Sequence, residues 1–165
     1  MSDKTTLDPN YGHYYRTVLE FHIEDQRLCV PLDRPVDTGT AYDLNCYCPG
    51  PGFVVITAFN PRGISINEDQ NEARQEQLEV RMMDQRIPYL RCDGLDPDSD
   101  HRERGIAVHM DRPTAHDLGV EFEQSAMYWF DGSRFWLVPV LARGRRSEIL
   151  PKGQKTHSGT TTIKI

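Results

Sequence analysis

The chain has 165 residues, of which 38% are hydrophobic and 27% charged, and its formal net charge at pH 7 is −6. These values are typical of one globular domain, exclude a disordered chain, and disfavour general nucleic-acid binding because an acidic surface repels phosphate. The longest apolar run, residues 53–59, is too short to span a bilayer and no signal peptide is evident, so we expect a cytoplasmic protein without a membrane partner.

The first half of the chain predicts three strands and a long helix. Aromatic and β-branched residues favour strands over residues 14–23, 26–32 and 53–59. The run at 53–59 is continuously apolar except for one threonine, which is typical of a strand buried on both faces. Residues 40–47 could form one or two helical turns. Helical spacing covers residues 68–85, with Asn67 or Ser65 as the N-cap.

The second half predicts four more strands and a second helix. The strands cover residues 87–91, 105–110, 125–130 and 134–140. Residues 92–102 form an acidic loop, and residues 113–123 form a helix with Pro113 in its first turn. The dipeptide Asp131-Gly132 favours a tight turn that joins the last two strands as a hairpin.

This order predicts an α+β fold in a single domain. We expect a mixed or antiparallel sheet of about five to seven strands, backed by two main helices. Charge divides the chain further: residues 1–140 carry a balance of −11 and residues 141–165 one of +5. The expected organisation is a flexible N-terminus, a domain and a basic C-terminal tail, over residues 1–13, 14–140 and 141–165.

Patterns for metal, cofactor or nucleophile chemistry are lacking. Cys46 and Cys48 are separated by one residue, whereas structural zinc sites use two to four. The acidic segment 93–100 lacks the glycine and glutamate of a calcium-binding EF-hand loop. Phosphate-binding glycine loops and nucleophile elbows are also absent from the sequence. We therefore assign no metal site, and the cofactor is unknown.

Polar residues gather where strand 53–59 leads into helix 68–85. Asn71 and Arg74 share the helix face of Leu78, which should be buried. Buried polar groups need partners, supplied either by the chain or by a bound molecule. The guanidinium groups of Arg62 and Arg74 would suit a carboxylate or a phosphate.

Two later residues could join this cluster. Glu103 precedes the strand at 105–110 and is the general-base candidate, although ion pairing would also explain it. Gln124 follows the second helix, where its amide could serve the cluster or the helix end. The expected site thus has Glu103 as its catalytic candidate, and its ligand-binding candidates are Thr57, Asn60, Arg62, Asn71, Arg74 and Gln124.

The segment Val55-Ile56-Thr57-Ala58-Phe59-Asn60-Pro61, followed by Asn71 and Leu78, resembles the signature of the bacterial domain-of-unknown-function 3293 family. Members are similar in a T-A-x-N-P strand end, an Asn/Leu helix, a glutamate before an apolar strand, and an F-x-Q-x-A motif, here at residues 122–126. The resemblance covers about residues 14–140. Arg104 departs from the pattern, which has a small residue or proline there. The family implies a set of residues and no established reaction.

Two functions from different classes remain open. The first is binding of a small anionic, nucleotide-like or phosphorylated ligand in a polar pocket at the end of strand 53–59, with or without catalysis by Glu103. The alternative is a protein-interaction module whose polar cluster is purely structural. That module would act through a protein partner at its aromatic hairpin, residues 128–136, or at its basic tail.

Overall fold

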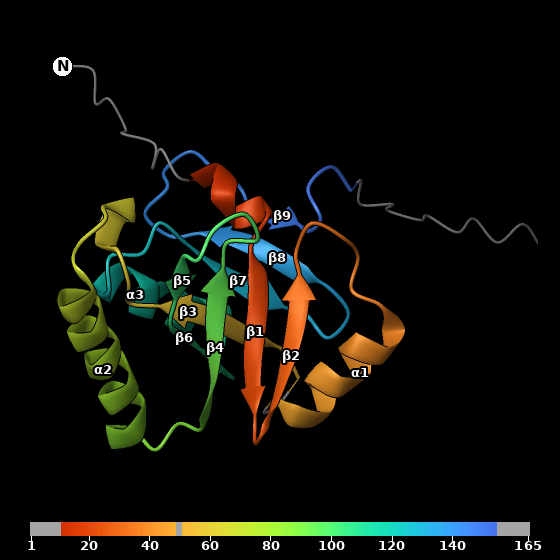
Figure 1. The fold of residues 1–165 in the computed structure, drawn as a ribbon, viewed down its shortest axis with the longest axis horizontal. Coiled ribbons are helices and arrows are strands. Elements are labelled where there is room, and N and C mark those ends of the chain that lie inside the picture. Colours follow the sequence, from red (N-terminus) through yellow and green to blue (C-terminus); the bar gives the residue numbers. More distant parts are fainter. Residues whose placement is uncertain (1–10, 49–50, 155–165) are drawn as a thin grey trace, which may run out of the picture.

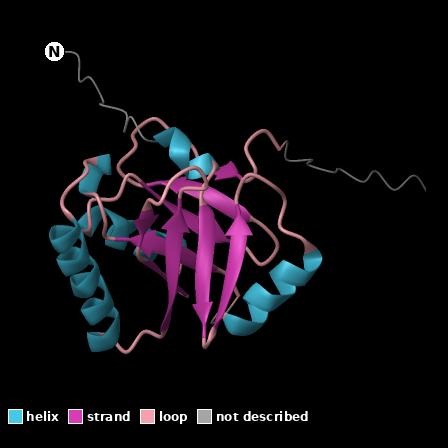
Figure 2. Ribbon diagram, viewed as in Figure 1, coloured by secondary structure: helices cyan, strands magenta, loops and turns pink. Residues whose placement is uncertain are grey.

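The computed structural model describes residues 11–48 and 51–154. In this part of the chain, nine strands form one sheet in which every pairing is antiparallel, and three α-helices pack against it (Figures 1 and 2). In chain order the elements are η1 (Tyr11–Tyr15), β1 (Val18–Ile23), β2 (Gln26–Pro31), α1 (Thr38–Tyr47), β3 (Phe53–Thr57), η2 (Pro61–Gly63), α2 (Glu68–Asp84), β4 (Tyr89–Leu95), β5 (Arg102–Glu103), β6 (Gly105–Val108), α3 (Arg112–Glu121), β7 (Ala126–Phe130), β8 (Phe135–Pro139) and β9 (Glu148–Ile149).

The sheet curls because β4 divides its length between two neighbours. The strand order is β2-β1-β4-β6-β3-β7-β8-β9, with β5 paired to β4. The first residues of β4, from Tyr89 to Arg91, pair with β6, and the later ones, from Cys92 to Leu95, pair with β1. Figure 1 shows the result: β1, β2 and β4 lie in front of β7 and β8 and run across them.

One hydrophobic core lies inside the curl. Its centre is a group of aromatic rings, Phe21, Phe53, Phe130 and Phe135, with neighbouring centroids 4.9 to 6.5 Å apart. All four side chains are fully buried. Leu44 of α1 packs into the same cluster. Burial of four aromatic side chains is a large stabilising contribution, since each removes about 150–250 Å² from water.

A second core fills the space between the other sheet face and the helices α2 and α3. Leu78 and Met82 of α2 and Leu118 of α3 pack there against Val54 and Ile106 of the sheet. Consequently the first four residues of β3 are buried on both faces, as the continuous apolar run predicts. β3 is thus the central strand of the domain.

The predicted fold class is confirmed, and the element counts are corrected. The sheet is antiparallel and has nine strands, more than the expected five to seven. The described residues contain three α-helices, one more than the two main helices expected. The additional helix is α1, whose N-terminus is capped by Asp37, since the Asp37 side chain accepts a hydrogen bond from the Thr40 backbone N–H. The two-residue strands β5 and β9 were missed because two residues carry no readable alternation.

Two local predictions are wrong. The strand expected from residue 14 begins at Val18, because the preceding tyrosines form η1 and Tyr11 packs edge-on against Tyr14 with centroids 5.1 Å apart. The acidic loop expected from residue 92 begins after Leu95, since the polar end of β4 is held by hydrogen bonds to β1. The first difference reflects packing within η1, and the second reflects pairing of two strands that are far apart in the sequence.

Part of the expected basic tail lies on the domain. Ile149 and Leu150 are buried, and β9 pairs with β8. Arg145 lies 3.9 Å from the ring centroid of Tyr11, and Lys152 lies 4.3 Å from that of Tyr15. Residues 1–10 and 155–165 of the expected flexible N-terminus and tail lie outside the described residues. None of the helices seen in residues 11–48 and 51–154 is long and apolar enough to cross a membrane.

Candidate functional site

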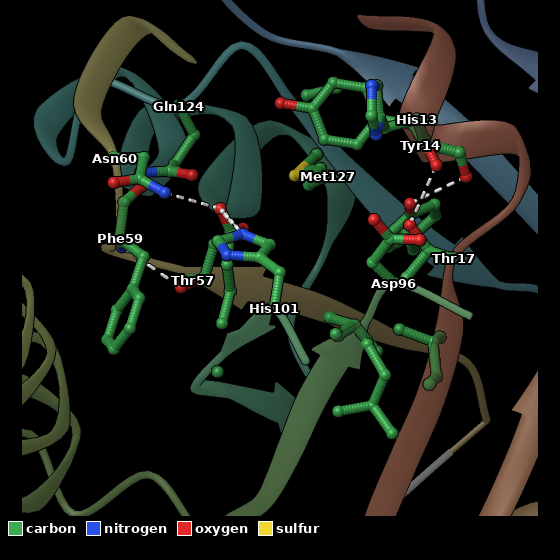
Figure 3. Close-up of a pocket in the computed structure, with 18 of the residues that line it drawn as sticks. His13, Tyr14, Thr17, Thr57, Phe59, Asn60, Asp96, His101, Gln124 and Met127 are labelled. Carbon is green, nitrogen blue, oxygen red and sulfur yellow. Dashed lines mark hydrogen bonds and ion pairs between the residues drawn. The ribbon is translucent and has the colours of Figure 1, made fainter. Parts of the chain in front are cut away.

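A cavity of about 640 Å³ opens beside the end of β3. Its walls come from η1, the start of β1, β3, the end of β4, β5 and β7, together with the segments after β3 and α3. Figure 3 shows Thr57, Asn60 and Gln124 at one end and His13, Tyr14 and Asp96 at the other. We call these the Asn60 end and the η1 end. Apolar side chains, among them Met127 and Leu19, line the space between them.

Asn60 is the central residue of the Asn60 end. Its backbone is left-handed, with φ of 45°, a conformation that asparagine adopts more readily than most residues. The side chain of Asn71 on α2 holds it there: Asn60 donates its backbone N–H to Asn71 Oδ1 over 2.7 Å, and Asn71 donates its amide to Asn60 Oδ1 over 2.9 Å. The first turn of α2 therefore fixes where the Asn60 amide points.

Asn60 in turn orients Glu103. The Asn60 amide donates to Oε1 of Glu103 over 2.8 Å, and Nε2 of His101 lies 3.3 Å from the same oxygen. The hydrogen bond to Glu103 raises the pKa of the His101 imidazole above its ordinary value. Both contacts use Oε1, and among the described residues Oε2 of Glu103 has no hydrogen-bond partner.

Gln124 is buried, and the nitrogen of its side-chain amide is hydrogen-bonded within the chain. It donates through Nε2 to the carbonyl oxygens of Phe59 and Phe122, both over 3.1 Å. The two carbonyls define the orientation of the amide, because only its nitrogen can donate. Its carbonyl oxygen makes no hydrogen bond to the part of the chain that the structure describes.

Thr57 lines the cavity, but its hydroxyl is used by the chain. It donates to the backbone oxygen of Arg104 over 2.6 Å and accepts the backbone N–H of Phe59 over 3.1 Å. Thr57 therefore shapes the wall where β3 ends, and it offers no donor to a bound molecule.

The two arginines lie behind the cavity wall. Arg74 donates to the carbonyl oxygens of Ala58 and Phe122 over 2.9 and 2.7 Å, which ties the end of β3 to the end of α3. Arg62 pairs with Glu123 at 3.0 Å and is exposed. Neither arginine nor Asn71 lines the cavity. Of the seven expected site residues, the structure brings Thr57, Asn60, Glu103 and Gln124 to the cavity, while Arg62, Asn71 and Arg74 surround its polar end.

Several lining residues were missed by sequence reasoning. His101 stands two residues before Glu103, a spacing that places two strand residues on one face, and this signal could have found it. His13 and Tyr14 carry no comparable signal, because η1 reaches the cavity through tertiary contacts. One such contact is the hydrogen bond from the Tyr128 hydroxyl to the Tyr14 carbonyl, over 2.8 Å.

Cys92 is the cysteine that lines the cavity, and its environment does not favour reactivity. Its side chain is fully buried, and burial raises the pKa of the thiol well above its ordinary value. The thiolate is the nucleophilic form of cysteine. Cys92 therefore contributes an apolar surface to the cavity.

A possible metal-ligating group lies outside the cavity. Glu20 and His22 of β1 and Asp93 of β4 offer ligand atoms within 4.8 Å of one another. Arg102 pairs with both carboxylates at 2.7 Å, and Arg91 also pairs with Asp93. Hydrogen bonding from Arg102 lowers the pKa of Glu20. The negative charge of this cluster is thus already balanced by two guanidinium groups.

Arg104, the departure from the family pattern, points to α2. It pairs with Glu79 at 3.0 Å and with Glu72 at 3.5 Å. Its backbone oxygen accepts the Thr57 hydroxyl, and its guanidinium group is paired with these α2 carboxylates.

Fold and site together define a small α+β domain whose curled antiparallel sheet encloses a partly polar cavity. The model of a family described as "Protein of unknown function (DUF3293)" matches residues 56–127, and the resemblance to that family is thereby confirmed. The matched stretch runs from β3 into β7 and contains Asn60, Glu103 and Gln124. No significant match was found among curated proteins or among solved structures.

Proposed function

We propose that this domain binds a small organic molecule in the cavity beside β3. The observation that carries the proposal is the cavity itself, whose volume of about 640 Å³ lies in the range of ligand pockets, roughly 300–1,000 Å³. Its composition is also that of a ligand pocket, since a mostly apolar surface is combined with a few polar groups at each end. Glu103 and Gln124 each present an oxygen atom there without a partner among the described residues.

The backbone around the cavity gives independent support. Asn60 and Arg62 both have left-handed backbones, with φ of 45° and 58°, within a four-residue turn. Such conformations cost free energy and are concentrated at functional sites. Here the turn is stabilised from both sides, by Asn71 and by Glu123, and its effect is to present the Asn60 amide to Glu103.

We retain an anionic, nucleotide-like or phosphorylated ligand in this proposal, but the residues that would bind its negative charge differ from those expected from the sequence. The sequence predicted that Arg62 and Arg74 would bind this negative charge. In the structure Arg62 forms an ion pair with Glu123, and Arg74 donates to backbone carbonyl oxygens. The basic residues that line the cavity include His13 and Arg16 at the η1 end, of which Arg16 is exposed and pairs with Asp98. An anionic group of the ligand would therefore lie at that end.

Glu103 is the residue best placed for acid–base chemistry on such a ligand. Its Oε1 is fixed by Asn60 while its Oε2 is available, which is the arrangement that a general base requires. His101 contacts the same carboxylate and could return the proton.

The alternative of a protein-interaction module has less support. Phe130 and Phe135 of the aromatic hairpin are fully buried, and Trp136 donates its indole N–H to Asp131. Arg145 and Lys152 of the basic segment lie over tyrosine rings of η1. These side chains are thus engaged within the chain.

Gly94 provides a direct test of the cavity proposal. It lines the cavity, and an added Cβ would have ordinary contact with Thr17, at 3.5 Å. Gly94→Leu should therefore place a branched side chain in the cavity and obstruct it, while Gly94→Ala should leave it open. We would screen wild type and both variants by thermal shift and ligand-observed NMR, against nucleotides, sugar phosphates, dicarboxylates, amines and neutral ring fragments.

The expected result is a class of molecules that binds wild type and Gly94→Ala but not Gly94→Leu. A ligand at a hundred times its dissociation constant should stabilise the fold by about 2.7 kcal/mol. Absence of binding across the whole screen, or binding that survives Gly94→Leu, would overturn the proposal. In that case the interaction role would be pursued with the intact chain as bait.

A further inference from the structure

The polar atoms left without a partner among the described residues at the Asn60 end are mainly hydrogen-bond acceptors. Gln124 donates both amide hydrogens to backbone carbonyls, Thr57 donates its hydroxyl to the Arg104 carbonyl, and Asn60 donates one of its two amide hydrogens to Glu103. The oxygens that remain, Oε2 of Glu103 and Oε1 of Gln124, accept hydrogen bonds and cannot donate as a carboxylate and an amide carbonyl. His101 is the exception, since its second ring nitrogen can take either role.

The charge of the Asn60 end also favours a ligand group that donates hydrogen bonds. The guanidinium groups that could have offset Glu103 are directed elsewhere, Arg74 to the Ala58 and Phe122 carbonyls and Arg104 to Glu79. Asn60 touches Glu103 with a neutral amide. His101 contacts the same Oε1, and that contact raises the pKa of its imidazole, so Oε2 is the carboxylate oxygen left for a bound cation. A carboxylate in a partly enclosed cavity gains more from a bound cation than an exposed one does.

Resting on the ligand-binding role proposed above, we infer that the group bound at the Asn60 end is a protonated amine or a similar cationic N–H group. It donates to Oε2 of Glu103 and Oε1 of Gln124 at once. The apolar part of the ligand then lies against the middle of the cavity, near Met127. An anionic group at the η1 end is compatible with this arrangement, so the ligand class is that of amines carrying an apolar or ring-shaped body.

A carboxylate or a phosphate at the same place is disfavoured for a physical reason. It would face the Glu103 carboxylate and the Gln124 carbonyl, while the amide hydrogens of Gln124 and the Thr57 hydroxyl are already donated to backbone carbonyls. Like charges at hydrogen-bond distance repel strongly where the surrounding dielectric constant is low. A neutral alcohol could donate one hydrogen bond to the carboxylate, but it carries no positive charge to offset the negative charge of Glu103.

The experiment compares matched fragments that differ only in this group. Triplets share one ring skeleton and carry an amine, an alcohol or a carboxylate; tryptamine, tryptophol and indole-3-acetate form one such set. Each is titrated into ¹⁵N-labelled protein, and dissociation constants are taken from shifts of amide signals around the cavity. Wild type is compared with Glu103→Gln, which keeps the shape of the side chain, and with Asp96→Asn, which removes a carboxylate at the η1 end. Gly94→Leu identifies binding elsewhere.

We expect amines to bind wild type about tenfold or more tighter than the matched carboxylates, a preference that Glu103→Gln abolishes and Asp96→Asn retains. Equal or tighter binding of the carboxylates, lost in Gly94→Leu, would overturn this inference and leave the ligand-binding role intact. If no member of any triplet shifts the cavity signals, both proposals fail. If the Glu103→Gln variant does not fold, the relative affinities of amine, alcohol and carboxylate for the wild-type protein decide whether the inference holds.

Discussion

At the scale of single residues, the polar groups around β3 divide into two sets. Asn60, Glu103 and Gln124 face the cavity, whereas Arg74 and Asn71 hold the backbone that carries them. Both sets are buried or half-buried polar groups, and their composition does not distinguish them. The two sets differ in their hydrogen-bond partners. Arg74 donates to backbone carbonyl oxygens of the chain, whereas Glu103 keeps one carboxylate oxygen without a partner among the described residues, facing the cavity.

Arg74 should therefore behave as a structural residue. Arg74→Ala removes two charge-assisted hydrogen bonds and leaves the carbonyls of Ala58 and Phe122 without them. We expect the free energy of unfolding to fall by about 2–3 kcal/mol, measured by urea denaturation. Arg62→Ala is the matched control, since that arginine is 67% exposed and its ion pair with Glu123 should contribute no more than about 1 kcal/mol. Equal small losses in both variants would contradict the structural role of Arg74.

At the level of helices and strands, β6 lies close to both of its neighbours, β3 and β4, beside the cavity. Gly105, the first residue of β6, sits beside β3 and β4, where a Cβ atom would lie 2.8 Å from the backbone oxygens of both Cys92 and Ile56. Backbone oxygens in a sheet centre cannot move aside as a flexible side chain can. The polar turn before β6, with Glu103, is thus fixed in position by a residue without a side chain.

Gly105→Ala should consequently destabilise the sheet. We expect a loss of about 2–3 kcal/mol in the free energy of unfolding, from overpacking against two strands. Gly94→Ala on β4 is a control of the same chemistry, because its added Cβ meets only Thr17 at an ordinary distance, and its effect should stay below about 1 kcal/mol. Chemical denaturation of the two variants side by side decides this, and a Gly94→Ala loss as large as that of Gly105→Ala would refute the packing argument.

At the scale of the whole molecule, the C-terminal segment completes the η1 end. Leu150 packs in the inner core and Ile149 belongs to β9, while Arg145 and Lys152 lie over Tyr11 and Tyr15 of η1. Since η1 forms a wall of the cavity, the end of the described chain supports the cavity although it does not line it. The basic charge of this segment is therefore partly used in tertiary structure.

Leu150→Ala should reveal this structural role. The side chain is 3% exposed, and removal of a buried leucine typically lowers the free energy of unfolding by about 2–5 kcal/mol. Arg146→Ala, at an exposed position nearby, should change it by less than about 0.5 kcal/mol. Thermal and urea unfolding of both proteins give the comparison. A Leu150→Ala protein as stable as wild type would mean that the segment does not pack as described.

Features that depend on local pattern could be predicted from the sequence. The continuous apolar run at Phe53 predicted β3, and Asp131-Gly132 predicted the hairpin of β7 and β8. The cap signals at Ser65 and Asn67 placed the start of α2 within two residues, and the structure has Asn67 as the N-cap. The family resemblance marked the same neighbourhood, and four of the seven expected site residues line one cavity. Each of these signals is carried by residues within a few positions of one another.

Residue patterns were enough to predict the α+β class, the central strand and the polar neighbourhood at its end, because helix caps, turns and hydrophobic periodicity act over a few residues. The folded arrangement was needed to find that Arg74 donates to backbone carbonyls, that β4 continues along β1, and that η1 closes the cavity. These outcomes depend on contacts across large separations, such as the hydrogen bond between Tyr128 and Tyr14, which are 114 positions apart. Local patterns carry no information on which distant groups will satisfy a buried polar atom, and that choice is what separates a structural residue from one that faces a ligand.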